Sequence, residues 1–193
     1  MARPSLQDKR RTEILECCEK IVLTEGLGAI SISRLGRDLG IDRTTIHHHV
    51  GSLTDIHAAL IQHIVDSFRT EAGVEDGSQP DINRYIDTLF RADFTARHLD
   101  KVMDQFEAKA YEQASIRKQV NRFYEMLEKA SVEYVIAALP QLPRPAARQL
   151  GQNLYALLEG AYLLQNWGRP KARMNGAREA ARTLVKATCD AHR

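Results

Sequence analysis

Residues Ser31–His49 read SISRLGRDLGIDRTTIHHH, and this stretch decides the fold. It holds two short helical patterns separated by Gly40, and glycine ends a helix in the left-handed conformation at low cost. Gly36, one turn earlier, is expected to leave room for the crossing helix to come close. Asp42 is placed to cap the second helix by accepting its first N–H groups. The stretch predicts a helix-turn-helix. Apolar side chains are expected to lock its two helices together: Ile32, Leu35, Leu39, Ile41 and Ile46.

The second helix of this pair carries polar side chains that suit DNA. In a helix-turn-helix that binds DNA, the second helix enters the major groove and contacts base edges and phosphates. A plain helical bundle with a glycine turn is the alternative, because motif matches carry false positives. Arg34 lies in the first short helix, and the exposed candidates on the second are Arg43, Thr44, Thr45, His47 and His48.

The composition is that of a globular protein with one large or two small domains. The chain has 193 residues, of which 44% are hydrophobic and 27% charged, and its net charge is only +2. Any contact with phosphates must therefore come from the placement of basic residues and not from overall basicity. The N-terminus lacks the apolar run of a signal peptide, and no stretch has 18 consecutive apolar residues. We expect a cytoplasmic protein without a membrane partner.

The cysteine pattern and the motif inventory argue against several other functions. Three cysteines without CxxC spacing exclude a disulfide framework and a zinc site. His47, His48 and His49 point about 100° apart on a helix, so they would not converge on one metal ion. No P-loop, GxSxG or HExxH motif is present. We therefore expect no enzyme, no catalytic residue, no metal and no cofactor.

The rest of the chain shows helical periodicity without an alternating strand pattern. Proline interrupts it at Pro140–Pro145, and turn-forming residues interrupt it at 73–80. On helix 8–24, Cys17 and Cys18 fall on the apolar face and are expected to be core residues. The other expected helices are 55–71, 81–98, 99–112, 115–139, 146–167 and 171–191. The sequence predicts an all-α protein.

The last two expected helices suit a two-fold interface. Helix 146–167 is long and apolar, and helix 171–191 is rich in alanine and glycine, so the pair can pack closely. Two copies would then form a four-helix bundle at the centre of a homodimer. A dimer is favoured because one DNA-binding head alone would read only a few bases. The alternative is that both helices are buried within one subunit.

Three segments resemble the TetR family of repressors: TEGLGAIS at 24–31, LGRDLGID at 35–42 and TTIHHHVGSL at 44–53. The resemblance runs from about Arg10 to Ile64, and the body resembles the family in architecture, including EGAYLL at 159–164. It implies an N-terminal three-helix helix-turn-helix DNA-binding domain at 1–53. It also implies a C-terminal helical ligand-binding and dimerisation domain at 54–193.

The resemblance assigns roles to individual residues of the helix-turn-helix. Ser31 would bind a phosphate, and Arg43, Thr44 and Thr45 would face the bases. His47 stands where the family usually has a phosphate-contacting tyrosine. The sequence departs from the family pattern at three positions: His47 is shorter than tyrosine, Val50 replaces a packed phenylalanine, and Leu53 replaces a lysine that meets the phosphate backbone.

The resemblance also implies a small-molecule effector bound in the body. Taken singly, each aromatic residue there predicts core packing, but together they could line an apolar cavity with polar anchors. The candidate ligand-binding residues are Phe90, Phe94, Met103, Phe106, Tyr124, Tyr155, Glu159 and Tyr162.

The function expected from the resemblance is a ligand-responsive transcriptional repressor that binds a palindromic, double-stranded DNA operator as a homodimer. The ligand would act through helix 55–71, which joins the two parts. Two alternatives stay open: a DNA-binding regulator controlled by a partner protein, and a helical enzyme or scaffold with a corner like a helix-turn-helix.

Overall fold

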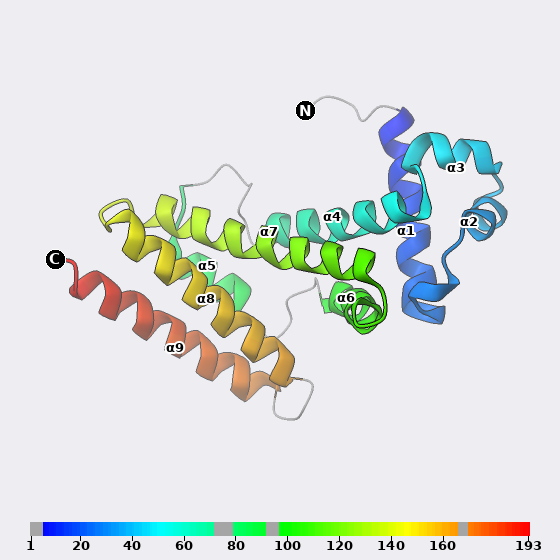
Figure 1. Cartoon of the computed structure of the whole chain (residues 1–193). Coiled ribbons are helices and arrows are strands. Elements are labelled where there is room, and N and C mark those ends of the chain that lie inside the picture. Colours follow the sequence, from blue (N-terminus) through cyan, green and yellow to red (C-terminus); the bar gives the residue numbers. More distant parts are fainter. Residues whose placement is uncertain (1–5, 72–78, 92–96, 166–169) are drawn as a thin grey trace. The chain divides into compact units, whose positions relative to one another are not determined.

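The computed structural model describes residues 6–71, 79–91, 97–165 and 170–193 (Figure 1). Within these ranges every regular element is helical, which confirms the all-α prediction. None of the described helices combines the length and hydropathy of a membrane span. The elements are α1 (Leu6–Glu25), the 3-10 turn η1 (Leu27–Ala29), α2 (Ile32–Leu39), α3 (Arg43–Val50), α4 (Leu53–Glu71), α5 (Ile82–Leu89), α6 (Arg97–Ala110), α7 (Ala114–Ala138), α8 (Arg144–Gln165) and α9 (Pro170–Asp190).

The chain forms two compact units. Unit 1 comprises Met1–Asp66 and His98–Phe123, and unit 2 comprises Ser67–Arg97 and Tyr124–Arg193. Two helices, α4 and α7, begin in one unit and end in the other. The resemblance implies a different division, into a DNA-binding domain at 1–53 and a ligand-binding domain at 54–193. That division is one of function, and it stays a prediction.

The apolar face of α1 and the two short helices build the core of unit 1. The predicted contacts Leu35 of α2 and Ile46 of α3 are both 0% exposed, while Ile32, Leu39 and Ile41 are half-buried. Cys18 of α1 is also fully buried, and burial raises the pKa of its thiol to about 12. This thiol is therefore a packing group, as the spacing of α1 predicts.

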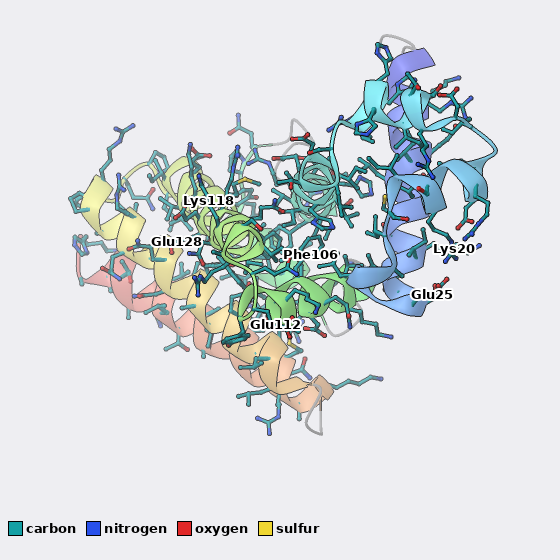
Figure 2. All side chains as sticks on the ribbon, turned by 45° about the vertical axis from the view of Figure 1, so that its right-hand side comes forward. Lys20, Glu25, Phe106, Glu112, Lys118 and Glu128 are labelled. Atoms are coloured by element: carbon teal, nitrogen blue, oxygen red, sulfur yellow. The ribbon has the colours of Figure 1, made fainter. Side chains whose placement is uncertain are left out.

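The later helices of unit 1 pack beside α4. Phe106 of α6 points toward α4 (Figure 2), where its ring meets His57 edge-on with the centroids 5.5 Å apart. Gln119 of α7 donates from Nε2 to the carbonyl oxygen of Thr54 at 3.4 Å. Burial lowers the pKa of His57, so this contact favours a neutral imidazole. Unit 1 therefore closes around the first turns of α4.

In unit 2, α7 and α8 approach so closely that a glycine is required. A Cβ at Gly151 of α8 would lie 2.6 Å from Cα of Val132 on α7. Ser131 donates its hydroxyl to the Gly151 carbonyl at 3.1 Å, beside the same contact. The following helix, α9, runs alongside α8 (Figure 1).

Polar contacts attach the short helix α5 to its neighbours in unit 2. Asp81 caps α5 by accepting the backbone N–H groups of Asn83 and Arg84. The ring of Tyr85 stacks on Tyr134 of α7, with centroids 4.1 Å apart. On the other side, Asp87 accepts from Arg182 of α9 at 2.5 Å.

Two predicted boundaries are wrong. The helix predicted at 81–98 ends at Leu89, and α6 begins at Arg97. No glycine or proline marks this end, so periodicity alone carried the prediction too far. The proline break predicted at Pro140–Pro145 is shorter than expected, because α8 begins at Arg144. Proline is tolerated in the first turn of a helix, where N–H groups lack partners in any case. The other predicted helix ends differ from the observed ends by at most two residues.

Candidate nucleic-acid interface

The turn between α2 and α3 has the geometry that its sequence predicts. Gly40 adopts φ 67° and ψ 30°, which is the left-handed conformation. The N–H of Ile41 returns to the carbonyl oxygen of Gly36 at 2.9 Å, so α2 ends in a closed turn. A Cβ at Gly36 would lie 2.8 Å from the carbonyl oxygen of Ile41. The neighbour that requires Gly36 is thus the backbone of the turn itself and not the crossing helix that the sequence suggested.

Asp42 caps α3, as expected. Its carboxylate accepts the backbone N–H of Thr45 at 2.7 Å and the hydroxyl of Thr45 at 2.8 Å. These hydrogen bonds hold the pKa of Asp42 below its ordinary value. The ionised carboxylate of Asp42 therefore fixes the start of α3.

An acid titration should reveal this cap. A carboxyl whose pKa is lower in the folded state contributes stability above its unfolded pKa, near 3.8, and this contribution is lost as the pH falls through the folded value. Asn at position 42 can still cap but cannot ionise. We expect the difference in unfolding free energy between the parent chain and Asp42→Asn to shrink as the pH falls below 4. A difference that stays constant from pH 7 to pH 3 would contradict this role.

The exposed face of α3 is polar and partly basic. Arg43, Thr44, His47 and His48 are exposed, whereas Thr45 is half-buried and its hydroxyl is committed to Asp42. Four of the five candidates predicted on this helix therefore face solvent together. In the described part of the chain, no three His, Cys, Asp or Glu side chains come together as metal ligands.

The two candidates outside α3 are engaged within the protein. The guanidinium of Arg34 donates two hydrogen bonds to Glu25, at 2.6 and 2.9 Å, and one to Asp38 at 2.5 Å. These bonds raise the pKa of Arg34 and lower the pKa values of both carboxyls. Ser31 caps α2 by accepting the N–H of Arg34 at 3.2 Å. Both residues therefore position α2.

Two further contacts lie at the end of α3 and the start of α4; sequence reasoning missed the first, whereas it offered Ser52 or Thr54 as the cap of the helix at 55–71, and the structure shows Ser52 in that role. Arg11 of α1 donates to the carbonyl oxygen of His49 at 3.0 Å, which ties α1 to the last turn of α3. Ser52 and Asp55 form a reciprocal cap at the start of α4, with a 2.8 Å bond from Ser52 N to Asp55 Oδ2. The Ser52-x-x-Asp55 spacing signals the second contact, whereas no local signal marks the first.

The candidate ligand-binding residues are divided between the two units. Met103 and Phe106 belong to the core of unit 1, where they are 4% and 0% exposed. Phe94 lies outside the described residues. The remaining candidates lie in unit 2. Phe90 and Tyr155 are buried there, whereas Tyr124, Glu159 and Tyr162 are half-buried.

Comparisons with known proteins agree with the helix-turn-helix. No family model matches the chain. A curated relative, the HTH-type transcriptional regulator BetI of Rhizobium meliloti (strain 1021), is 20% identical over 174 residues, covering 86% of this chain and 82% of the relative. The crystal structure of a TetR transcriptional regulator from Legionella pneumophila superposes with a TM-score of 0.62 at 19% identity, covering 95% of this chain and 98% of the other.

The chain has the TetR fold. A second solved structure of similar fold, a candidate transcriptional regulator from Saccharomonospora viridis in complex with choline, covers 92% of this chain and 96% of its own at 19% identity and a TM-score of 0.62. The likeness to the TetR structure from Legionella pneumophila covers 95% of the chain, which confirms that the resemblance seen from about Arg10 to Ile64 continues in the architecture of the body.

Proposed function

We propose that this chain is a DNA-binding transcriptional regulator that represses its targets by binding a palindromic operator as a homodimer. The observation that carries this proposal is the exposed polar face of α3, where Arg43, Thr44, His47 and His48 stand together on a capped helix held by α1 and α2. Guanidinium, hydroxyl and imidazole groups are suited to hydrogen bonds with base edges in the major groove.

The first test is binding to the DNA upstream of the chain's own gene across a series of salt concentrations. A regulator should bind this DNA more tightly than a shuffled duplex, with an affinity that falls steeply as salt rises. A genomic selection for bound fragments extends the search to other operators. Failure to select any sequence in that experiment would overturn the proposal.

Arg43 should contribute directly to operator binding. Because a good base contact is worth about 1–3 kcal/mol, we expect Arg43→Ala to weaken operator binding by roughly 5- to 150-fold. Lys118→Ala is the matched control, since it removes one exposed positive charge from α7 without touching α3. Equal losses in the two variants, measured by fluorescence anisotropy, would show that Arg43 acts only through general charge.

Thr45 is expected to act mainly through the cap. Its hydroxyl would need to leave Asp42 before it could contact a base. Arg34 likewise would need to exchange a carboxylate for a phosphate, and Ser31 would contact a phosphate from the start of α2. We propose these three as secondary contacts beside the exposed set on α3.

The proposed dimer uses α8 and α9. In the isolated chain Leu163 is 70% exposed and Leu164 is 46% exposed at the end of α8. On α9, Gly176 and Ala180 face solvent, while Ala177 and Ala181 pack inward. An exposed apolar and small-residue face suits a two-fold interface. We expect Leu163→Lys to shift the chain toward monomer in sedimentation experiments without changing its helical content. A dimer that is unchanged in this variant would show that the end of α8 is not part of the interface.

The proposed effector binds in the helical body, where unit 2 supplies Phe90, Tyr124, Tyr155, Glu159 and Tyr162. Met103 and Phe106 are further candidates in unit 1. Choline, present in the structural neighbour from Saccharomonospora viridis, is a reasonable first compound. Release of operator DNA on addition of a compound would support ligand control, which needs a coupling free energy of about 1–3 kcal/mol.

A further inference from the structure

The last turn of α3 carries three consecutive histidines, His47, His48 and His49. His47 and His48 are exposed, and His47 follows the exposed Arg43 by one turn. His49 is half-buried, and its Nδ1 is buried without a hydrogen-bond partner. The rings of His48 and His49 meet edge-on, with their centroids 5.3 Å apart. His49 therefore belongs to the packing beneath α3, whereas His47 and His48 are presented to whatever α3 contacts.

Histidine is the residue type whose charge changes in the physiological range of pH. A neutral imidazole donates one hydrogen bond and accepts one, whereas an imidazolium donates two and carries a positive charge. Against a phosphate, the charged form makes the stronger hydrogen bond, and it also releases a counterion from the DNA. A histidine that meets a phosphate therefore binds DNA more tightly when it is protonated.

Permanent positive charges near α3 are partly engaged within the protein. Arg34 of α2 is held by two carboxylates, and Arg11 of α1 donates to the backbone at the end of α3. The side chain of Arg37 on α2 is 71% exposed, and Arg43 is exposed at the start of α3. Since the net charge of the whole chain is only +2, two additional protons on α3 would change the charge of this face substantially.

Carboxylates near α3 could attract a protonated imidazole in competition with DNA. Asp42 accepts hydrogen bonds from Thr45, and Asp55 accepts hydrogen bonds from Ser52 at the start of α4. These bonds hold the pKa values of both carboxyls below their usual range. Further carboxylates of α1 and α2 are paired with arginines: Glu13, Glu25 and Asp38. Because these acceptors are engaged, His47 and His48 remain available to phosphates.

We propose that His47 and His48 make DNA binding by this chain dependent on protons, because each imidazolium adds a positive charge to the exposed face of α3. This inference rests on the proposed function and adds regulation by pH at the same site. Arg43 supplies a charge that is constant with pH, and the two histidines supply one that rises as the pH falls.

The test measures binding of the full chain to a labelled duplex of shuffled sequence, by fluorescence anisotropy at pH 6 and pH 8 across a salt series. Phosphates are the same in every sequence, so the result does not require the operator. We expect binding to be roughly fivefold or more tighter at pH 6. The plot of log affinity against log salt should also be steeper at pH 6, by up to about 0.9 for each imidazolium that meets a phosphate.

Equal affinities at the two pH values would overturn the proposal, as would failure to bind the duplex at either pH. Selective binding to operator DNA at pH 8 tests the regulator function separately, because Arg43 stays charged there. A chain that selects an operator but binds DNA equally at both pH values would therefore be a regulator without this proton dependence.

A double variant, His47→Gln with His48→Gln, keeps polar side chains that cannot take up a proton. Its affinity at pH 6 is compared with its own affinity at pH 8, so contacts made at both pH values cancel. We expect it to lose the gain in affinity and the steeper salt dependence. His192→Gln is the matched control, since His192 is exposed beyond α9 in unit 2, and it should keep both. A double variant with the pH dependence of the parent would overturn the assignment to these histidines.

Discussion

Replacing Gly151 with alanine is expected to lower the free energy of unfolding by about 1–3 kcal/mol, the usual cost of overpacking. The added Cβ would lie 2.6 Å from Cα of Val132 and 3.1 Å from its backbone nitrogen. A flexible side chain could move aside, but here the neighbour is the backbone of α7. The two helices must therefore separate or shift along each other.

Helix propensity works in the opposite direction and decides the choice of control. Alanine is favoured over glycine inside a helix by up to about 1 kcal/mol, which is less than the expected cost of the clash at Gly151. Gly160, also on α8, has no atom within 4 Å of its hypothetical Cβ. Gly160→Ala should therefore leave stability unchanged or raise it. Chemical denaturation of both variants measures the contrast, and equal stabilities would mean that α7 and α8 can separate freely at Gly151.

The second large effect is expected at Gly36. Its hypothetical Cβ lies 2.8 Å from the carbonyl oxygen of Ile41, while its own carbonyl oxygen accepts the N–H of Ile41 at 2.9 Å. Both the N–H and the carbonyl oxygen of Ile41 therefore lie against Gly36, and the turn packs tightly on α2. Gly36→Ala must open this turn, so we expect a loss of about 1–3 kcal/mol in stability and a loss of operator binding.

Gly28→Ala is the matched control for Gly36→Ala. Gly28 lies in η1 of the same unit, and no atom lies within 4 Å of its hypothetical Cβ. We expect this variant to keep both its melting temperature and its operator affinity. A Gly36→Ala chain that binds operator like the parent would show that the angle between α2 and α3 is not set by this contact.

The helix-turn-helix could be predicted because its determinants are local. The left-handed turn at Gly40 and the cap at Asp42 each depend on a few neighbouring residues, and both are confirmed. The end of α5 at Leu89 has no such marker, since neither glycine nor proline follows it. Local rules therefore described the start of the chain better than its middle.

The candidate site shows the same division. The exposed set on α3 follows from helical spacing, which the sequence displays directly. The engagement of Arg34 by Glu25 joins residues nine positions apart across η1, and the bond from Arg11 to His49 spans 38 positions. Such pairs depend on the tertiary structure, so the sequence marked Arg34 as basic without showing that its donors are already in use.

The interior of unit 2 was the hardest part to predict. Aromatic spacing identified Tyr155 as a candidate, but only the tertiary structure shows that it is buried, at 8% exposed, and that the equally buried Tyr134 pairs its hydroxyl with the backbone of Asp81. Met103 and Phe106 have the same residue chemistry as the other candidates, yet they belong to the core of unit 1. Only the tertiary neighbours of each candidate show to which unit it belongs and how deeply it is buried.

The chain path through unit 1 limits how this protein can be recombined. The first compact unit is assembled from two separate segments, Met1–Asp66 and His98–Phe123. A fragment that stops at residue 66 would lack Phe106 and the other buried side chains of α6 and early α7. Exchanging the helix-turn-helix unit with that of another protein of this fold would therefore require two coordinated transplants. Gene fusions with a single junction should yield poorly folded chimeras, so unit 1 and unit 2 are expected to be inherited as one piece.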